Sequence, residues 1–335
     1  MMEQIRCLYC GRVISEQSQY EIKNEWHKKC QKEFFGTSDF PEIDLSKDQM
    51  EKLANETVKQ KITIPGVQKK LSLHLSRGEH SRLTIVDYPT GYILKPQTEE
   101  YAYLPEYEDL AMRIAKVAGV QTVPFGLIKT GDSYAYITKR IDRDVEDDKV
   151  KKYAMEDFCQ LSNRLTYDKY RGSYEGCGRI IKKYSNQVGF DLSEMYLRIL
   201  ISFLIGNSDM HLKNFSLREK VSMCREYSLS AAYDIVPTNL ILPEDEEEMA
   251  LTVNGKKKNI TKKDFYLMAE HCGVNRKAAD KMMQRVCKTM EAYIILIKQS
   301  KLPVEKQEEM IVFMKMRAKR FDVNWLGFKI KCEKS

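Results

Sequence analysis

The sequence predicts an α+β protein with two lobes, one rich in strands and one helical, preceded by a small metal-binding module. Three observations lead to this prediction. Apolar and polar residues alternate over much of the stretch 61–96, and apolar residues recur with helical spacing over most of the chain after about residue 153. In addition, three of the nine cysteines fall within the first 30 residues. A chain of 335 residues has room for about two domains and one small module.

The composition is typical of a folded protein and argues against disordered or collagen-like structure. Hydrophobic residues make up 43% and charged residues 31% of the chain. No apolar run reaches the roughly 18 residues that a membrane helix needs, and no signal peptide is visible at the N-terminus. We therefore expect a cytoplasmic protein with reduced thiols and no membrane partner. The net charge of +7 permits an anionic partner without requiring nucleic acid.

The first module, residues 1–36, contains two pairs of metal-binding residues. Cys7 and Cys10 are separated by two residues, as are His27 and Cys30. Thiolate and imidazole groups are the ligands that tetrahedral zinc prefers, and a set of four leaves no open position for chemistry. A segment this short has too small a core to fold alone, so we expect structural Zn²⁺. The alternative is that three buried thiols and a surface histidine lie there by coincidence.

A polar connector with a short helical pattern is expected over 37–60, followed by the sheet-rich lobe over 61–145. Turns that contain Gly or Pro separate three alternating runs, which is typical of a small antiparallel sheet. A helix is predicted over 105–118, because Pro105 falls in the first turn and apolar residues share one face. The other elements expected here are strands over 123–129 and 134–139 and a charged linker over 145–152.

Residues 146–335 are predicted to form the helical lobe. Its helices are expected over 155–161, 192–205, 262–271, 276–299 and 304–321. The stretch 215–242 is an exception, since its short apolar pieces favour small strands and turns. A cleft between a sheet lobe and a helical lobe is a common place for a ligand.

Three residues of the helical lobe point to phosphoryl transfer. Asp209 and Asn214 are separated by four residues, and Asp234 follows within an apolar stretch. Protein kinases use this spacing, in which an Asp accepts the proton of the attacking hydroxyl while the Asn and a later Asp hold Mg²⁺. Carboxylate, amide and phosphate oxygens suit Mg²⁺. The sequence therefore predicts a catalytic base at Asp209 and metal ligands at Asn214 and Asp234.

The sheet-rich lobe supplies a second set of candidates. Lys95 ends an apolar strand, and Glu108 follows thirteen residues later on the predicted helix. Such a lysine can contact nucleotide phosphates while the glutamate holds its ammonium group. Taken alone, the two are more ordinary as a surface lysine and a solvated helix glutamate. The loop 62–70 has a single glycine, so it is weak support for a phosphate loop.

The stretch 206–217, Gly-Asn-Ser-Asp-Met-His-Leu-Lys-Asn-Phe-Ser-Leu, resembles the signature of HipA-type serine/threonine kinases, which are toxins of bacterial toxin–antitoxin modules. Segments 62–71, 156–160, 165–170 and 232–236 resemble the same family. The similarity extends over about residues 60–325. Its most specific part is the Asp-x-His-x-Lys-Asn core followed by Tyr-Asp.

The resemblance implies a two-lobed protein-kinase-like fold that uses ATP and Mg²⁺. It makes Asp209 the catalytic base, places His211 beside the nucleotide, and makes the segment from Lys139 to Ile141 the hinge next to the adenine. It also implies that Thr63 is autophosphorylated, which would eject the phosphate loop and act as a switch. The residues expected to cover the phosphates are Pro65, Gly66, Val67, Gln68, Lys69 and Lys70.

Several features depart from the family's pattern. Thr63 stands where a Ser is usual, Lys69 follows the loop Gln in place of an acid, and Lys139 replaces the usual hinge acid. The chain also has the Cys/His module instead of an N-terminal subdomain. By resemblance we expect a protein substrate, with aminoacyl-tRNA synthetases among the family's targets. We also expect a helix-turn-helix antitoxin and a separate small protein equivalent to the missing subdomain, with DNA contacted only through the antitoxin.

Two other functions remain open at this point. The first is a kinase-fold binding protein that acts as an antitoxin-bound corepressor, with lysines 256–258 and 262–263 near DNA phosphates. A simpler interpretation is that those lysines are exposed to solvent, in a loop and at the start of a helix. The second is a small-molecule kinase, which would use the same catalytic residues.

Overall fold

The protein is described by a computed structural model that places residues 4–43, 70–76, 81–85, 91–146 and 149–321. The predicted switch residue Thr63, the loop residues Pro65, Gly66, Val67, Gln68 and Lys69, and the helical pattern within 37–60 lie outside the described residues.

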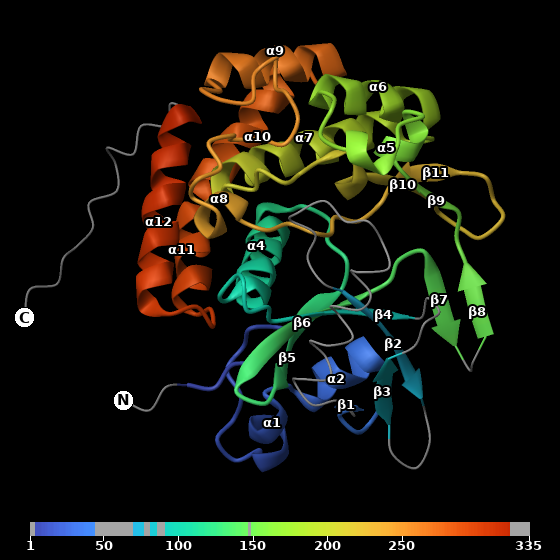
Figure 1. Cartoon of the computed structure of the whole chain (residues 1–335), viewed down its shortest axis with the longest axis vertical. Helices are drawn as coiled ribbons and strands as arrows, with labels where there is room; N and C mark the ends of the chain where they lie inside the picture. The colour runs from blue at the N-terminus through green and yellow to red at the C-terminus, as the bar shows by residue number, and fades with distance from the viewer. Residues whose placement is uncertain (1–3, 44–69, 77–80, 86–90, 147–148, 322–335) are drawn as a thin grey trace, which may run out of the picture.

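A six-stranded sheet forms the first lobe (Figure 1). Its strand order is β1-β3-β2-β4-β6-β5, and all neighbours are antiparallel except the parallel pair β1 and β3. Leu71, Leu73 and Leu94 are buried, as the alternating pattern predicts. The strand bounds are β1 Glu42–Ile43, β2 Leu71–Ser76, β3 Arg82–Ile85, β4 Tyr92–Pro96, β5 Phe125–Thr130 and β6 Ser133–Lys139.

Helix α4, Leu104–Ala118, lies between the sheet and the helical lobe in Figure 1. It confirms the prediction for 105–118, with Pro105 in its first turn and Gly119 ending it at a φ of 96°. Positive φ is accessible to glycine without steric strain, so Gly119 can turn the chain from the helix toward β5. The helix is buried along most of its length, which fixes its side chains against both lobes.

The N-terminal segment packs against the sheet. Its helices are α1, Gln19–Asn24, and α2, Lys28–Phe35. Trp26 is fully buried, stacks on Tyr9, and donates from Nε1 to the carbonyl of Leu127 on β5 at 2.9 Å. Residues of this segment and of both lobes belong to one continuous hydrophobic core.

The helical lobe is built around α7, Val188–Ile205, which is buried over most of its length. None of the helices within the described part of the chain combines the length and apolar character of a membrane span. The other helices are α5 Phe158–Leu161, α6 Tyr174–Tyr184, α8 Thr238–Ile241, α9 Lys262–Cys272, α10 Arg276–Lys288, α11 Met290–Lys298 and α12 Val304–Ala318, with 3-10 turns at Thr166–Asp168, Leu212–Asn214 and Lys319–Phe321.

Three predictions for local structure were wrong. Residues 155–157 form strand β9, Met155–Asp157, because they pair with β10, Ser216–Glu219, instead of beginning a helix. The predicted linker over 145–152 contains a hairpin of β7, Arg143–Glu146, and β8, Lys149–Lys152. The predicted helix over 276–299 breaks at Thr289 into α10 and α11. The remaining strand is β11, Tyr227–Leu229, which pairs with β10.

Candidate active site

The loop after α7 carries the predicted catalytic base. Gly206 ends the helix at a φ of 80°, and a Cβ there would approach the Phe313 ring within 2.6 Å. Its conformation and its surroundings therefore both require glycine. The side chain of Asn207 then accepts a hydrogen bond from the backbone N–H of Asp209 at 3.1 Å. This turn directs Asp209 into the space between the lobes.

Asp209 and Asn214 are joined by a hydrogen bond. The Asn214 Nδ2 donates to the main-chain carbonyl of Asp209 at 2.8 Å. Because the amide nitrogen is engaged in this way, Oδ1 is the atom that Asn214 can offer to a cation. Tyr170 donates its hydroxyl to Oδ1 of Asp209, and burial raises the pKa of the Asp209 carboxyl. The loop therefore holds a carboxylate in a defined position with a more basic character than a surface aspartate.

Lys95 lies between two carboxylates. Its Nζ is 2.6 Å from Oε1 of Glu108 and also contacts Oδ1 of Asp234. Lys95 is 3% and Glu108 0% exposed, so the reading of this pair as solvated surface groups was wrong. Burial opposes ionisation of Lys95 and Asp234, but the Lys95 ammonium outweighs this effect at Asp234 and lowers the pKa of that carboxyl to about 2. In turn, Asp234 and Glu108 raise the pKa of Lys95 despite its burial.

Asp234 also has an unusual backbone conformation, with a φ of 56°. Non-glycine residues in this region are uncommon, and they concentrate at functional sites. This strained conformation supports a functional role for the Asp234 carboxylate, since it costs free energy of folding.

His211 borders Asp209 as a neutral ring. Burial first, and then the nearby Lys169, lower its pKa to about 3. Its Nε2 lies 3.9 Å from Oδ1 of Asp209, and its ring meets the Tyr170 ring edge-on at 5.1 Å. A neutral imidazole suits a wall that contacts a nucleotide without adding charge.

These side chains line one cleft of about 670 Å³ between the lobes, a volume suited to a nucleotide-sized ligand. Glu108 lies behind Lys95, within the core. In the predicted hinge, Lys139 directs its ammonium to the carbonyl of Glu33 in α2 at 3.4 Å. The predicted residues that line the cleft are Lys70, Lys95, Lys139, Ile141, Asp209, His211, Asn214 and Asp234.

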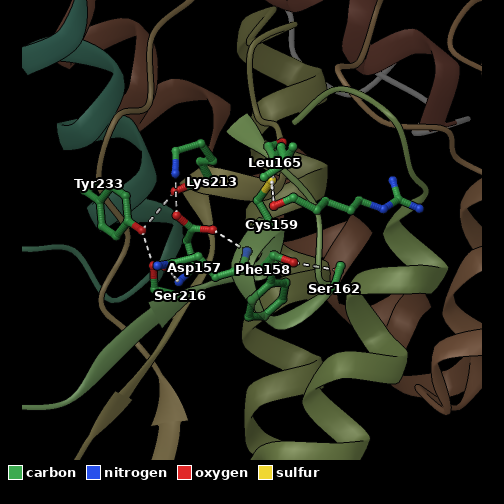
Figure 2. Close-up of polar contacts among 10 residues, drawn as sticks. Asp157, Phe158, Cys159, Ser162, Leu165, Lys213, Ser216 and Tyr233 are labelled. Atoms are coloured by element: carbon green, nitrogen blue, oxygen red, sulfur yellow. Dashed lines mark hydrogen bonds and ion pairs between the residues drawn. The ribbon is translucent and has the colours of Figure 1, made fainter. Parts of the chain in front are cut away.

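Two contacts on the floor of the cleft hold the loop in place (Figure 2). Lys213, next to Asn214, forms an ion pair with Asp157 at 2.6 Å. Tyr233, next to Asp234, donates its hydroxyl to the carbonyl of Lys213 at 3.2 Å. The two candidate metal ligands are therefore tied to each other through neighbouring residues.

The sequence patterns did not identify Tyr170, Lys169 or the Lys213–Asp157 pair as site residues. Lys169 is 7% exposed and lies within the electrostatic reach of Asp209, although burial lowers its pKa. The segment 165–170 carried part of the family resemblance, but no spacing rule pointed to either residue. Their role depends on contacts across about forty residues of chain, as between Tyr170 and Asp209.

The predicted Cys/His set forms a compact cluster. The ligand atoms of Cys7, Cys10, His27 and Cys30 all lie within 4.8 Å of one another. Nδ1 of His27 is 3.3 Å from Sγ of Cys10, and Nε2 is 3.2 Å from the carbonyl of Val13. A hydrogen bond to that carbonyl fixes the ring with Nδ1 facing the thiols, as in protein zinc sites. The donor set and its spacing fit tetrahedral Zn²⁺.

Of the two lysine runs considered for DNA contact, the run 256–258 is paired with carboxylates of this chain. Lys256 contacts Asp264 at 3.0 Å, Lys257 contacts Glu247 at 2.9 Å, and Lys258 contacts Glu246 at 2.5 Å. These carboxylates offset the positive charge that phosphate binding would need.

A family model described as the HipA-like C-terminal domain matches residues 62–294. A protein of Haemophilus influenzae named "Putative kinase" is 26% identical over 73% of this chain and 77% of its own length. A "Putative kinase" of Sinorhizobium fredii is 32% identical over 59% of this chain and 50% of its own length. The serine/threonine-protein kinase toxin HipA of Shewanella oneidensis is 26% identical over 58% of this chain and 47% of its own. The chain thus spans about half the length of these last two relatives.

Two solved structures share the fold. The Shewanella oneidensis HipA, solved with HipB and operator DNA, has a TM-score of 0.65 at 18% identity, covering 82% of this chain and 71% of that one. The Helicobacter pylori proinflammatory kinase CtkA has a TM-score of 0.51 at 14% identity, covering 75% and 93%. At these identities the likeness concerns the fold, and it confirms the predicted two-lobed kinase-like architecture.

Proposed function

Since the chain belongs to the family of HipA-like C-terminal domains, we propose that it is an ATP- and Mg²⁺-dependent kinase that phosphorylates serine or threonine residues of a protein. Relatives named as kinases support a kinase-like function. The observation that carries the finer proposal is the convergence of Lys95, Asp209, Asn214 and Asp234 on one cleft.

The residues divide the work of phosphoryl transfer. Asp209 orients the acceptor hydroxyl and takes its proton as the hydroxyl oxygen bonds to the γ-phosphorus and the bond to the bridging oxygen of ADP breaks. Asn214 and Asp234 would hold Mg²⁺, which neutralises charge on the phosphates. Lys95, on β4, contacts the phosphates beside Asp234, and Glu108 fixes its ammonium. Tyr170 keeps the Asp209 carboxylate aimed at the acceptor.

The substrate and its control follow from the family resemblance. We propose a bacterial protein target, such as an aminoacyl-tRNA synthetase, whose modification arrests growth in the cytoplasm. Phosphorylation of Thr63 would switch the phosphate loop off. A helix-turn-helix antitoxin and a separate small protein similar to the N-terminal subdomain of larger family members are the proposed partners, with operator DNA reached through the antitoxin. The Cys/His cluster would hold structural Zn²⁺.

Transfer of labelled phosphate from ATP and Mg²⁺ tests this proposal. Wild type is compared with Asp209→Asn and with Asp132→Asn, a matched control in the exposed turn between β5 and β6. We expect label on the wild type and the control, mapped to Thr63 or to an added target, and none on Asp209→Asn. ATP binding without transfer, in the presence of lysate proteins and both partners, would instead favour the corepressor function.

A further inference from the structure

Arg113 connects α4, the helix that carries Glu108, to the Cys/His cluster. Its Nη2 donates to the carbonyl of Leu8 at 2.6 Å, and its Nη1 donates to the carbonyl of Tyr9 at 3.0 Å. Leu8 and Tyr9 are the two residues between Cys7 and Cys10. The guanidinium is therefore hydrogen-bonded to the backbone of the turn that contains two of the four candidate metal ligands.

The same guanidinium is anchored on α4 itself. Its Nε and Nη2 donate to the two carboxylate oxygens of Asp109 at 2.6 and 3.0 Å. The side chains of Arg113 and Asp109 are 16% and 9% exposed. Asp109 adjoins Glu108, which holds Lys95. The planar guanidinium donates two hydrogen bonds to Asp109 and one to each of two carbonyls of the turn. It therefore fixes the position of the turn relative to α4.

A second contact leads from the cluster to the sheet. The backbone N–H of Leu127 on β5 donates to the carbonyl of Leu8 at 3.2 Å. β5 is the outer strand at this end of the sheet, so the turn covers an edge that would otherwise be open. At Gly126, a Cβ would lie 3.1 Å from this same carbonyl and 3.1 Å from the Trp26 ring. The turn is therefore in close contact with both α4 and the sheet.

The turn carries Cys7 and Cys10, two of the four ligand candidates. The turn is closed by hydrogen bonds from the N–H of Cys7 to the carbonyl of Arg12 at 2.9 Å and from the N–H of Gly11 to the carbonyl of Cys7 at 2.8 Å. The other two ligand candidates come from the region of α2, and a bound ion would tie them to the turn.

We propose that the Cys/His cluster is a zinc site that positions α4, and with it the carboxylate of Glu108 that pairs with Lys95. Arg113 is the positioning residue that connects the two. The catalytic consequence rests on the proposed kinase function, whereas the effect on α4 does not. Loss of the metal or of the arginine bridge loosens α4 and lowers the rate of phosphoryl transfer.

The test uses the full chain and a double variant, Arg113→Gln with Asp109→Asn, which removes the bridge without leaving a buried carboxylate unpaired. Arg6→Gln is the matched control, because Arg6 bonds to the carbonyl of Gly11 in the same turn and not to α4. Zinc content, hydrogen exchange of amides 104–118, and kcat and KM for ATP in phosphoryl transfer are measured for each. Wild type stripped of metal by a chelator is the fourth sample.

We expect the wild type and both variants to hold zinc at one ion per cluster. In the double variant, exchange over 104–118 rises and kcat falls by about tenfold, the range of coupling through a positioning contact, with KM for ATP little changed. Arg113→Lys, which retains the ion pair and can still reach one carbonyl, recovers part of kcat. Metal removal raises exchange both in the first 35 residues and over 104–118, and Arg6→Gln behaves as wild type.

Two results would overturn the inference. One is a wild type that binds no zinc; the other is unchanged exchange over 104–118 after metal removal or in the double variant. If the wild type transfers no phosphate to Thr63 or to an added target, the kinase proposal fails, while zinc content and hydrogen exchange still decide the positioning proposal.

Discussion

Two buried glutamates on α4, two residues apart, differ in whether a cation lies beside them. Glu106 is 7% exposed, and its Oε2 has no hydrogen-bond partner among the described residues. Glu108 is 0% exposed and pairs with Lys95 at 2.6 Å. The same isosteric change, Glu to Gln, should therefore have opposite effects on stability at the two positions.

The expected effect at Glu106 follows from its pKa. Burial, and then the repulsion of Asp109, raise the pKa of Glu106 from 4.5 to about 7. A carboxyl whose pKa is higher in the folded than in the unfolded chain stabilises the fold below the unfolded pKa, and this stabilisation is lost as the pH rises through the folded pKa. At about 1.4 kcal/mol per pKa unit, the loss is about 3 kcal/mol by pH 8. Glutamine cannot ionise, so Glu106→Gln avoids this loss. Relative to wild type, the free energy of unfolding should therefore rise at pH 8 and barely change near pH 4.5.

Glu108→Gln leaves the buried Lys95 ammonium with one carboxylate fewer, and we expect a loss of about 3 kcal/mol at neutral pH. Urea unfolding of both variants and of wild type at several pH values measures these changes. On heating, a gain of about 3 kcal/mol corresponds to a rise of about 6 °C in Tm for a large domain. A gain for Glu106→Gln that is equal at pH 5 and pH 8, or a gain for Glu108→Gln, would refute the reasoning.

Two further predictions concern the catalytic loop and the seat of the N-terminal segment. Tyr170→Phe removes the hydroxyl that bonds to Asp209 and should lower kcat by about tenfold with ATP affinity unchanged, as measured by single-turnover transfer and nucleotide titration; an unchanged kcat would argue against a role for Tyr170. Gly126→Ala places a methyl group 3.1 Å from the Trp26 ring and should destabilise the fold by about 1–3 kcal/mol. Gly189→Ala, in the first turn of α7 where a Cβ meets nothing within 4 Å, should be neutral or stabilising in the same unfolding assay, and equal effects of the two changes would contradict this account.

Local signals in the sequence were enough to predict α4 and the order of the site residues. Pro105 and Gly119 mark the two ends of α4, and the spacing of Asp209 and Asn214 reflects a loop that must turn back on itself within a few residues. The strand β9 was missed because its partner, β10, lies about sixty residues further along the chain. Short apolar segments take the structure that their partner imposes, and the partner is not visible in the segment itself.

The burial of the Asp109–Arg113 ion pair is another feature that the local sequence pattern could not predict. Asp109 and Arg113 are four residues apart on a helix, a spacing that ordinarily indicates a solvated ion pair worth a few tenths of a kcal/mol. Here the carbonyls of Leu8 and Tyr9, more than one hundred residues away, accept two further hydrogen bonds from the guanidinium. A buried charged pair adds little net stability even when it is well hydrogen-bonded, because both charges lose their hydration. This geometry supports the proposal that the bridge between the Cys/His cluster and α4 positions Glu108 and, through it, Lys95.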